Sequence, residues 1–168
     1  MTELEDIDDE YELQVLFELR ENEREEAERR YAQAMEQHEE LSREVEKLQR
    51  EHRQMIEKRK RTCRKFDEEI EEGGHTLEEI RRFDRYVSRL QDREEQMRDR
   101  VDQTRRKRRR AQKAVERAHD EMLEAIRQFQ AVKAHYEDWQ NDREVERRRK
   151  EAQKMDEIAS RIWSEENR

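Results

Sequence analysis

Apolar residues recur along two long stretches of the chain at alternating spacings of three and four. This spacing places side chains on one side of an α-helix, and its repeat over many heptads indicates helices that pair along a seam. The first stretch runs over residues 13–66 and the second over residues 80–139. The second keeps one phase throughout, with Glu94 and Arg108 occupying two of its seam positions. The pattern therefore predicts two long helices.

A short polar segment separates the two stretches. It contains the only two glycines, Gly73 and Gly74, which tolerate the left-handed backbone that ends a helix. Thr76 follows, with Glu79 three residues later, which is a capping box for a new helix. We expect one all-α domain over residues 1–168, with helix one at about 8–71, a loop at 72–76 and helix two at about 77–166. A loop this short makes the helices antiparallel, so the fold class is a coiled-coil hairpin.

The register of the hairpin can be tested by pairing residues that are equidistant from the Gly74–His75 bond. The predicted pairs include Phe66 with Phe83, Leu48 with Val101, Tyr31 with Ala118, Phe17 with Val132, and Leu13 with Tyr136. Oppositely charged segments favour the same register. The basic residues 105–110 lie beside Glu39, Glu40 and Glu44, and the basic residues 58–61 lie beside Asp92, Glu94 and Glu95. Exposed ion pairs of this kind contribute only ~0.2–1 kcal/mol each to folding stability. We therefore expect them to select the register of the hairpin rather than to stabilise the fold.

Helix two is expected to outlast its partner beyond about Trp139, which gives a C-terminal helical overhang. The overhang carries a new apolar stripe, out of phase with the earlier heptads: Ala152, Met155, Ile158, Ala159, Ile162 and Trp163. Nothing in the chain is left to cover this stripe, and the acidic tract Glu3–Glu10 lies near it. An uncovered apolar stripe of this kind is typical of a docking surface for a partner.

The composition narrows the function classes. Charged residues make up 51% of the chain, hydrophobic residues 30%, and there is no proline. That is too few apolar side chains for a compact enzyme core of this length. The 39 basic and 47 acidic residues nearly balance, to a net charge of −8, which favours paired helices over disorder. No run approaches the roughly 18 apolar residues of a membrane span or resembles a signal peptide, so we expect a cytoplasmic protein without membrane insertion.

Signals for a catalytic, metal or cofactor site are weak. The five histidines show no metal-ligand spacing, and the glycines form no phosphate-binding loop. We therefore predict no catalytic residue, metal or cofactor. The basic run at 105–110 could contact nucleic acid, but no aromatic residues interleave it and the protein is acidic overall, so no nucleic-acid partner is expected. The basic run at 147–150 lies in the overhang without facing carboxylates, and it is better placed to contact an acidic partner.

The ends of the chain resemble a known family. The opening Tyr11–Arg20 segment (YELQVLFELR), the following Glu23–Ala32 segment (EREEAERRYA) and the closing stretch with Tyr136, Trp139 and Arg147–Ala159 (RRRKEAQKMDEIA) are similar to the stalk proteins of type III secretion ATPases. These are the injectisome YscO-like family and its flagellar FliJ-like relative. The resemblance covers the whole chain in architecture, and it leaves open whether the system is an injectisome or a flagellum.

The resemblance implies a non-enzymatic stalk at the cytoplasmic side of the inner-membrane export apparatus. Its partners would be a hexameric ATPase, the cytosolic domain of the export gate, and escort chaperones. The implied ATPase-facing residues are Leu13, Leu16, Phe17, Leu19, Arg20, Tyr136, Trp139, Met155, Ile158 and Ile162. The implied gate-facing residues near the loop are Phe66, Phe83 and Val87, beside the turn residues Gly73, Gly74 and Thr76. The alternative is a generic cytosolic coiled-coil scaffold or tether, which would form dimers or larger oligomers.

Overall fold

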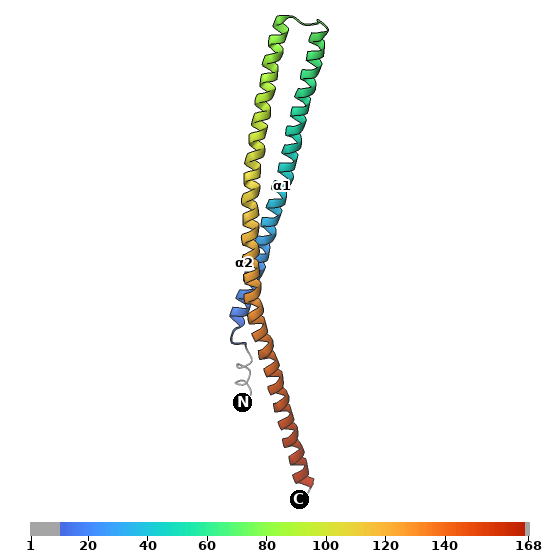
Figure 1. Cartoon of the computed structure of the whole chain (residues 1–168). Helices are drawn as coiled ribbons and strands as arrows, with labels where there is room; N and C mark the ends of the chain where they lie inside the picture. The colour runs from blue at the N-terminus through green and yellow to red at the C-terminus, as the bar shows by residue number, and fades with distance from the viewer. Residues whose placement is uncertain (1–10, 167–168) are drawn as a thin grey trace. The chain divides into compact units, whose positions relative to one another are not determined.

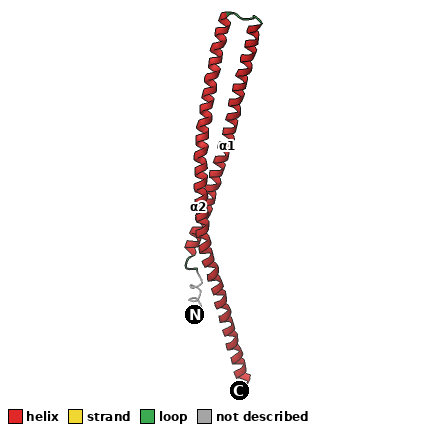
Figure 2. Ribbon diagram, viewed as in Figure 1, coloured by secondary structure: helices red, strands yellow, loops and turns green. Residues whose placement is uncertain are grey.

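The computed structural model describes residues 11–166, and these residues form two long helices (Figures 1 and 2). Helix α1 is Gln14–Glu71 and helix α2 is Leu77–Glu166, and the part of the chain that is described contains no strand. The sequence supports this directly, because no proline interrupts either helix and pairs such as Arg29–Glu25 and Arg43–Glu39 join successive turns. The predicted all-α hairpin of two helices is confirmed. Within 11–166, no helix is both long enough and apolar enough to span a membrane.

Helix α1 begins later than the sequence predicts. The expected start near residue 8 is wrong for residues 11–13, which form a turn, and residues 8–10 lie outside the described part. The turn is closed by a hydrogen bond of 2.9 Å from the Gln14 backbone N–H to the Tyr11 carbonyl. This bend lets the Tyr11 ring pack on α2, where it is buried. Leu13 is exposed instead, and it is Tyr11 that contacts Tyr136, at 5.0 Å between ring centroids.

The link between the helices is a compact turn. Helix α1 ends in a Schellman motif, in which Gly74 donates its backbone N–H to the Glu69 carbonyl and Gly73 donates to the Ile70 carbonyl. Gly73 has a φ of 84°, in the left-handed region that side chains with a Cβ rarely adopt. The paired glycines therefore stop α1 where the sequence indicates.

Contacts group the chain into two compact units. The hairpin unit is Arg30–His119, and the terminal unit takes in the chain up to Arg29 and from Asp120 onward. The single domain over 1–168 stays a prediction, so each unit is described by itself.

The hairpin unit buries the predicted seam. Its buried residues all occupy heptad positions of the two predicted stretches: Val45, Leu48, Glu94, Val101, Thr104 and Val115. Near the turn, the rings of Phe66 and Phe83 stack with 3.7 Å between centroids, which confirms that predicted pair. The Thr104 hydroxyl is buried, and it donates to the Arg100 carbonyl, so its burial leaves no unsatisfied donor.

The terminal unit is held by aromatic side chains from both helices. Phe17 lies between Phe129 and Tyr136, with centroid separations of 5.4 and 5.1 Å. Tyr11 adds contacts to Tyr136 and to Trp139, the latter at 5.3 Å. Beyond Trp139, α2 continues past the start of α1 (Figure 1). Every side chain from Val145 to Glu165, a segment called the overhang below, is exposed.

Candidate interaction surfaces

The residues implied to face an ATPase fall into two groups in the structure. Five of them lie at least partly within the contact between the helices of the terminal unit: Leu16, Phe17, Arg20, Tyr136 and Trp139. The other five are exposed: Leu13, Leu19, Met155, Ile158 and Ile162. Side chains in the first group are occupied by contacts inside the chain, as Arg20 is by its hydrogen bond of 2.6 Å to Gln128. The second group therefore offers the more exposed apolar surface to another molecule.

Four exposed apolar residues near the end of the overhang form one stripe. Met155, Ile158 and Ile162 follow each other at spacings of three and four, and Trp163 adjoins them. Their exposed fractions lie between 51% for Ile158 and 69% for Trp163. We call these four residues the apolar stripe. Large apolar side chains on a half-charged helix are usually turned toward a partner, so their shared exposure marks a surface that another molecule can bury.

The residues implied to face an export gate lie next to the turn, but they are largely paired with each other. Phe66 and Phe83 stack, and Val87 is half-buried. The exposed apolar side chains in this region are different ones: Ile70 at 36%, Leu77 at 74% and Tyr86 at 41%. The sequence patterns considered above assigned Leu77 no role. Its position before the first seam residue of α2, Ile80, was the available signal.

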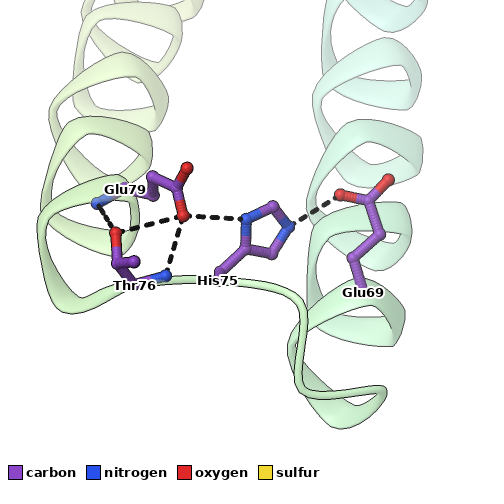
Figure 3. Close-up of polar contacts among 4 residues, drawn as sticks. All are labelled: Glu69, His75, Thr76 and Glu79. Atoms are coloured by element: carbon purple, nitrogen blue, oxygen red, sulfur yellow. Dashed lines mark hydrogen bonds and ion pairs between the residues drawn. The ribbon is translucent and has the colours of Figure 1, made fainter.

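The turn itself is fixed by a small polar network (Figure 3). The Thr76 backbone N–H donates to Oε2 of Glu79 at 2.7 Å, and the Glu79 backbone N–H donates to the Thr76 hydroxyl at 3.3 Å. This confirms the predicted capping box. The hydrogen bonds from the backbone and hydroxyl of Thr76 hold the pKa of Glu79 below its ordinary value. His75 lies between the two helices, with Nε2 at 2.9 Å from Glu69 and Nδ1 at 3.6 Å from Glu79.

A partly buried ion pair interrupts the apolar seam of the hairpin unit. Arg59 on α1 donates from Nε to Oε1 of Glu94 on α2 at 2.8 Å, and Glu94 is buried. The hydrogen bond to Glu94 raises the pKa of Arg59, against the opposing effect of burial. The predicted facing of residues 58–61 and Glu94 is confirmed by this pair. It fixes the register because either group alone would be left desolvated without a partner.

The basic run at 105–110 agrees with the prediction in part. Lys107 and Arg110 line one surface hollow together with Glu40 and Glu44 of α1, so these opposite charges do lie near each other. Arg105 instead pairs with Asp102 on its own helix at 3.3 Å. Among the described residues no group of three or more metal-ligating side chains gathers at one place.

At the start of α1, Tyr11 joins the aromatic packing to a polar contact. Its hydroxyl lies 2.8 Å from Nδ1 of His135 on α2. Burial raises the pKa of the Tyr11 phenol. This contact between the hydroxyl and the imidazole nitrogen anchors the chain just before the overhang.

Two long helices with a paired seam and an uncovered apolar stripe define a helical-hairpin protein whose exposed chemistry is suited to binding other proteins. A model of the YscO-like protein family matches residues 8–168, and the chain belongs to this family. Membership makes it a type III secretion related protein, in agreement with the resemblance noted in its sequence. Searches of curated proteins and of solved structures find no significant match.

Proposed function

We propose that the protein is the central stalk of a type III secretion system, binding and activating the hexameric export ATPase and coupling it to the export gate. Membership of the YscO-like family supports the secretion context. The observation that carries the ATPase contact is the apolar stripe, which is exposed on a helix end where all neighbouring side chains are exposed too.

The overhang has the chemistry of a helix that docks in a groove. Recognition of this kind uses apolar anchors at spacings of three and four along one helix face, as Met155, Ile158 and Ile162 provide. A single helix inserted into a ring of six equal subunits contacts them unequally. It therefore favours one subunit conformation at a time, and its binding energy is the means by which it changes turnover.

The turn region is the proposed contact with the cytosolic domain of the export gate. Phe66, Phe83 and Val87 hold the two helices together there, and the adjacent exposed Leu77 supplies apolar surface. The tight cap at Thr76 and Glu79 keeps this surface in a defined position. Secretion chaperones are proposed as further partners along the helices.

The ATPase contact is tested by turnover measurements with the purified hexameric ATPase. We expect the full chain to raise ATP hydrolysis and to co-migrate with the ATPase. The double variant Ile158→Glu/Ile162→Glu should lose both effects, because charged side chains cannot enter an apolar groove without a desolvation cost. The matched control is Leu77→Glu, which places the same charge at an exposed leucine in the hairpin unit. It should stimulate as the native chain does.

The result that would contradict the stalk function is a full chain that neither stimulates nor co-migrates. The scaffold alternative makes a different prediction, which analytical ultracentrifugation checks: the chain alone would sediment as a dimer or larger oligomer. The gate contact has its own test. Leu77→Glu should weaken binding to the isolated cytosolic gate domain, while Ile158→Glu/Ile162→Glu should not, and the reverse pattern would overturn the assignment of the two surfaces.

A further inference from the structure

The seam face of α2 changes its chemistry where α1 ends. Up to Trp139 this face carries Tyr136 and other side chains that pack on α1. At about 100° per residue, the positions that continue the same face beyond Trp139 include Arg143, Arg147, Lys150 and Lys154. Arg143 already lies over the Trp139 ring, with 5.6 Å from its guanidinium carbon to the ring centroid. The contact face therefore passes from aromatic to basic within one turn.

This basic face adjoins the apolar stripe but is centred on a different side of α2. The same helical geometry places the centre of the apolar stripe about 105° around α2 from the basic residues. A shallow hollow lies on the basic side, lined by Trp139, Arg143, Arg147 and Lys150 among others. Two acidic side chains also line it, Glu144 and Glu146, and Glu144 is engaged by Arg147 and Arg148. Lys150 and Lys154 are exposed.

The chain that leads into α1 has the complementary charge. The ten residues before Tyr11 hold six carboxylates and no lysine or arginine. They join the described chain at Tyr11, whose ring is anchored 5.3 Å from Trp139 and whose hydroxyl contacts His135. The acidic segment is therefore tethered at the point where the basic face starts.

The reach of the segment matches the length of the basic face. From Trp139 to Lys154 the helix rises about 23 Å. Eight residues, Glu3–Glu10, span about 26 Å if extended, and about 12 Å if helical. Either form reaches the hollow at Arg143 and Arg147, and the extended form also reaches Lys154. A tether this short gives the segment a high effective concentration at that face, which an untethered acidic partner has to exceed.

We infer that the acidic segment Glu3–Glu10 docks in cis on the basic face of α2 formed by Arg143, Arg147, Lys150 and Lys154. This continues the pairing of the terminal unit by ionic contacts beyond the point where its aromatic contacts stop. It neutralises this face of the helix and leaves Met155, Ile162 and Trp163 of the apolar stripe uncovered. The inference does not depend on the ATPase, since the segment and its site belong to the same chain.

Paramagnetic relaxation in the full chain tests this docking. The background is Cys63→Ser, which removes the only native thiol, and Thr2→Cys carries the spin label. At low salt the label should broaden the amide signals around Lys150 and Lys154. The broadening should fall by roughly twofold or more at high salt, where screening shortens the reach of the charges to a few ångströms.

Two triple variants distinguish ionic docking from chance proximity. Arg147→Gln/Lys150→Gln/Lys154→Gln should abolish the broadening. The control Arg106→Gln/Arg109→Gln/Lys113→Gln removes the same charge from exposed positions of the hairpin unit and should leave the broadening intact. Equal broadening in both variants, or none in the native sequence, would overturn the proposal. A mixture of spin-labelled chain and label-free ¹⁵N chain tests whether docking occurs between two chains. Broadening in this mixture would show that the acidic segment of a second copy occupies the basic face, and would overturn docking in cis.

Discussion

The hairpin unit and the overhang have similarly charged sequences, but one buries its apolar residues and the other exposes them. In the hairpin unit, Val45 and Val101 are 1% and 4% exposed, because a second helix covers the seam. In the overhang, Met155 and Trp163 are 66% and 69% exposed. The same heptad-like spacing therefore stabilises the fold in one region and leaves apolar surface exposed in the other. The presence or absence of a facing helix decides which.

The largest effect should come from a charge placed in the covered seam. Val101→Glu puts an unpaired carboxylate at a buried position and should lower the free energy of unfolding by about 3 kcal/mol or more. Urea unfolding followed by circular dichroism measures this. Gln103→Glu is the matched control, an exposed position two residues along the same helix. Equal stabilities of the two variants would show that the seam is not closed at Val101.

The ion pair within the seam should come next. Glu94→Ala removes the partner of a half-buried Arg59, and it should cost about 1–3 kcal/mol because the charged hydrogen bond is lost. The control Glu95→Ala removes an exposed carboxylate paired with Arg98 and should have little effect. Arg59→Met/Glu94→Leu should recover most of the loss, because an apolar pair can replace a satisfied ionic one. A double variant less stable than Glu94→Ala would argue against this account.

The cap of α2 should contribute less. Thr76→Ala removes the hydroxyl that accepts the Glu79 backbone N–H at the start of α2. It should lower the free energy of unfolding by about 1 kcal/mol, whereas Thr76→Ser should keep this hydrogen bond. The hydrogen bonds from Thr76 lower the pKa of Glu79, so this carboxylate stabilises the fold above its unfolded-state pKa. The contribution is lost as the pH falls through the lowered, folded-state pKa. Melting curves of the native chain and Glu79→Gln should therefore converge in acid, and a gap that stays constant with pH would contradict the role of Glu79.

The smallest effect on stability is expected in the overhang. Ile158→Glu/Ile162→Glu changes two large apolar residues, but both are exposed, so the free energy of unfolding should stay within about 0.5 kcal/mol of the native value. Urea unfolding under the same conditions as for Val101→Glu gives the direct comparison. A large loss would mean that the apolar stripe is covered within the chain.

Much of the fold could be predicted because helix pairing is encoded locally. Heptad positions identified the buried Val45, Leu48 and Val101, and the double glycine with Thr76 and Glu79 located the turn. These features follow from spacing and capping chemistry, which a single sequence displays.

The start of α1 could not be predicted in the same way. Tyr11 is out of phase with the seam residues Leu13 and Phe17, yet it is Tyr11 that is buried. It reaches α2 because the backbone turns before Gln14, and a turn resets the phase that heptad counting assumes. The side chain with the larger aromatic surface and a hydroxyl partner in His135 takes the contact, and Leu13 remains exposed.

The sequence could predict which residues share a candidate surface, but not which molecule binds there. Spacing indicated that Met155, Ile158 and Ile162 share a face, and the structure adds that this face is exposed. Phe66 and Phe83 differ from these exposed residues, because their rings stack on each other. The identity of a partner depends on the shape and charge of a second molecule, so it remains a proposal.

Hydrogen–deuterium exchange of the full chain, alone and with the hexameric ATPase, tests the central contrast most directly. Alone, amides of the hairpin seam around Leu48 and Val101 should exchange slowly and those of residues 152–163 quickly, since the latter lack tertiary packing. Addition of the ATPase should slow exchange in residues 152–163 and leave the seam unchanged. Slow exchange of the overhang in the isolated chain, or no protection on adding the ATPase, would contradict the account.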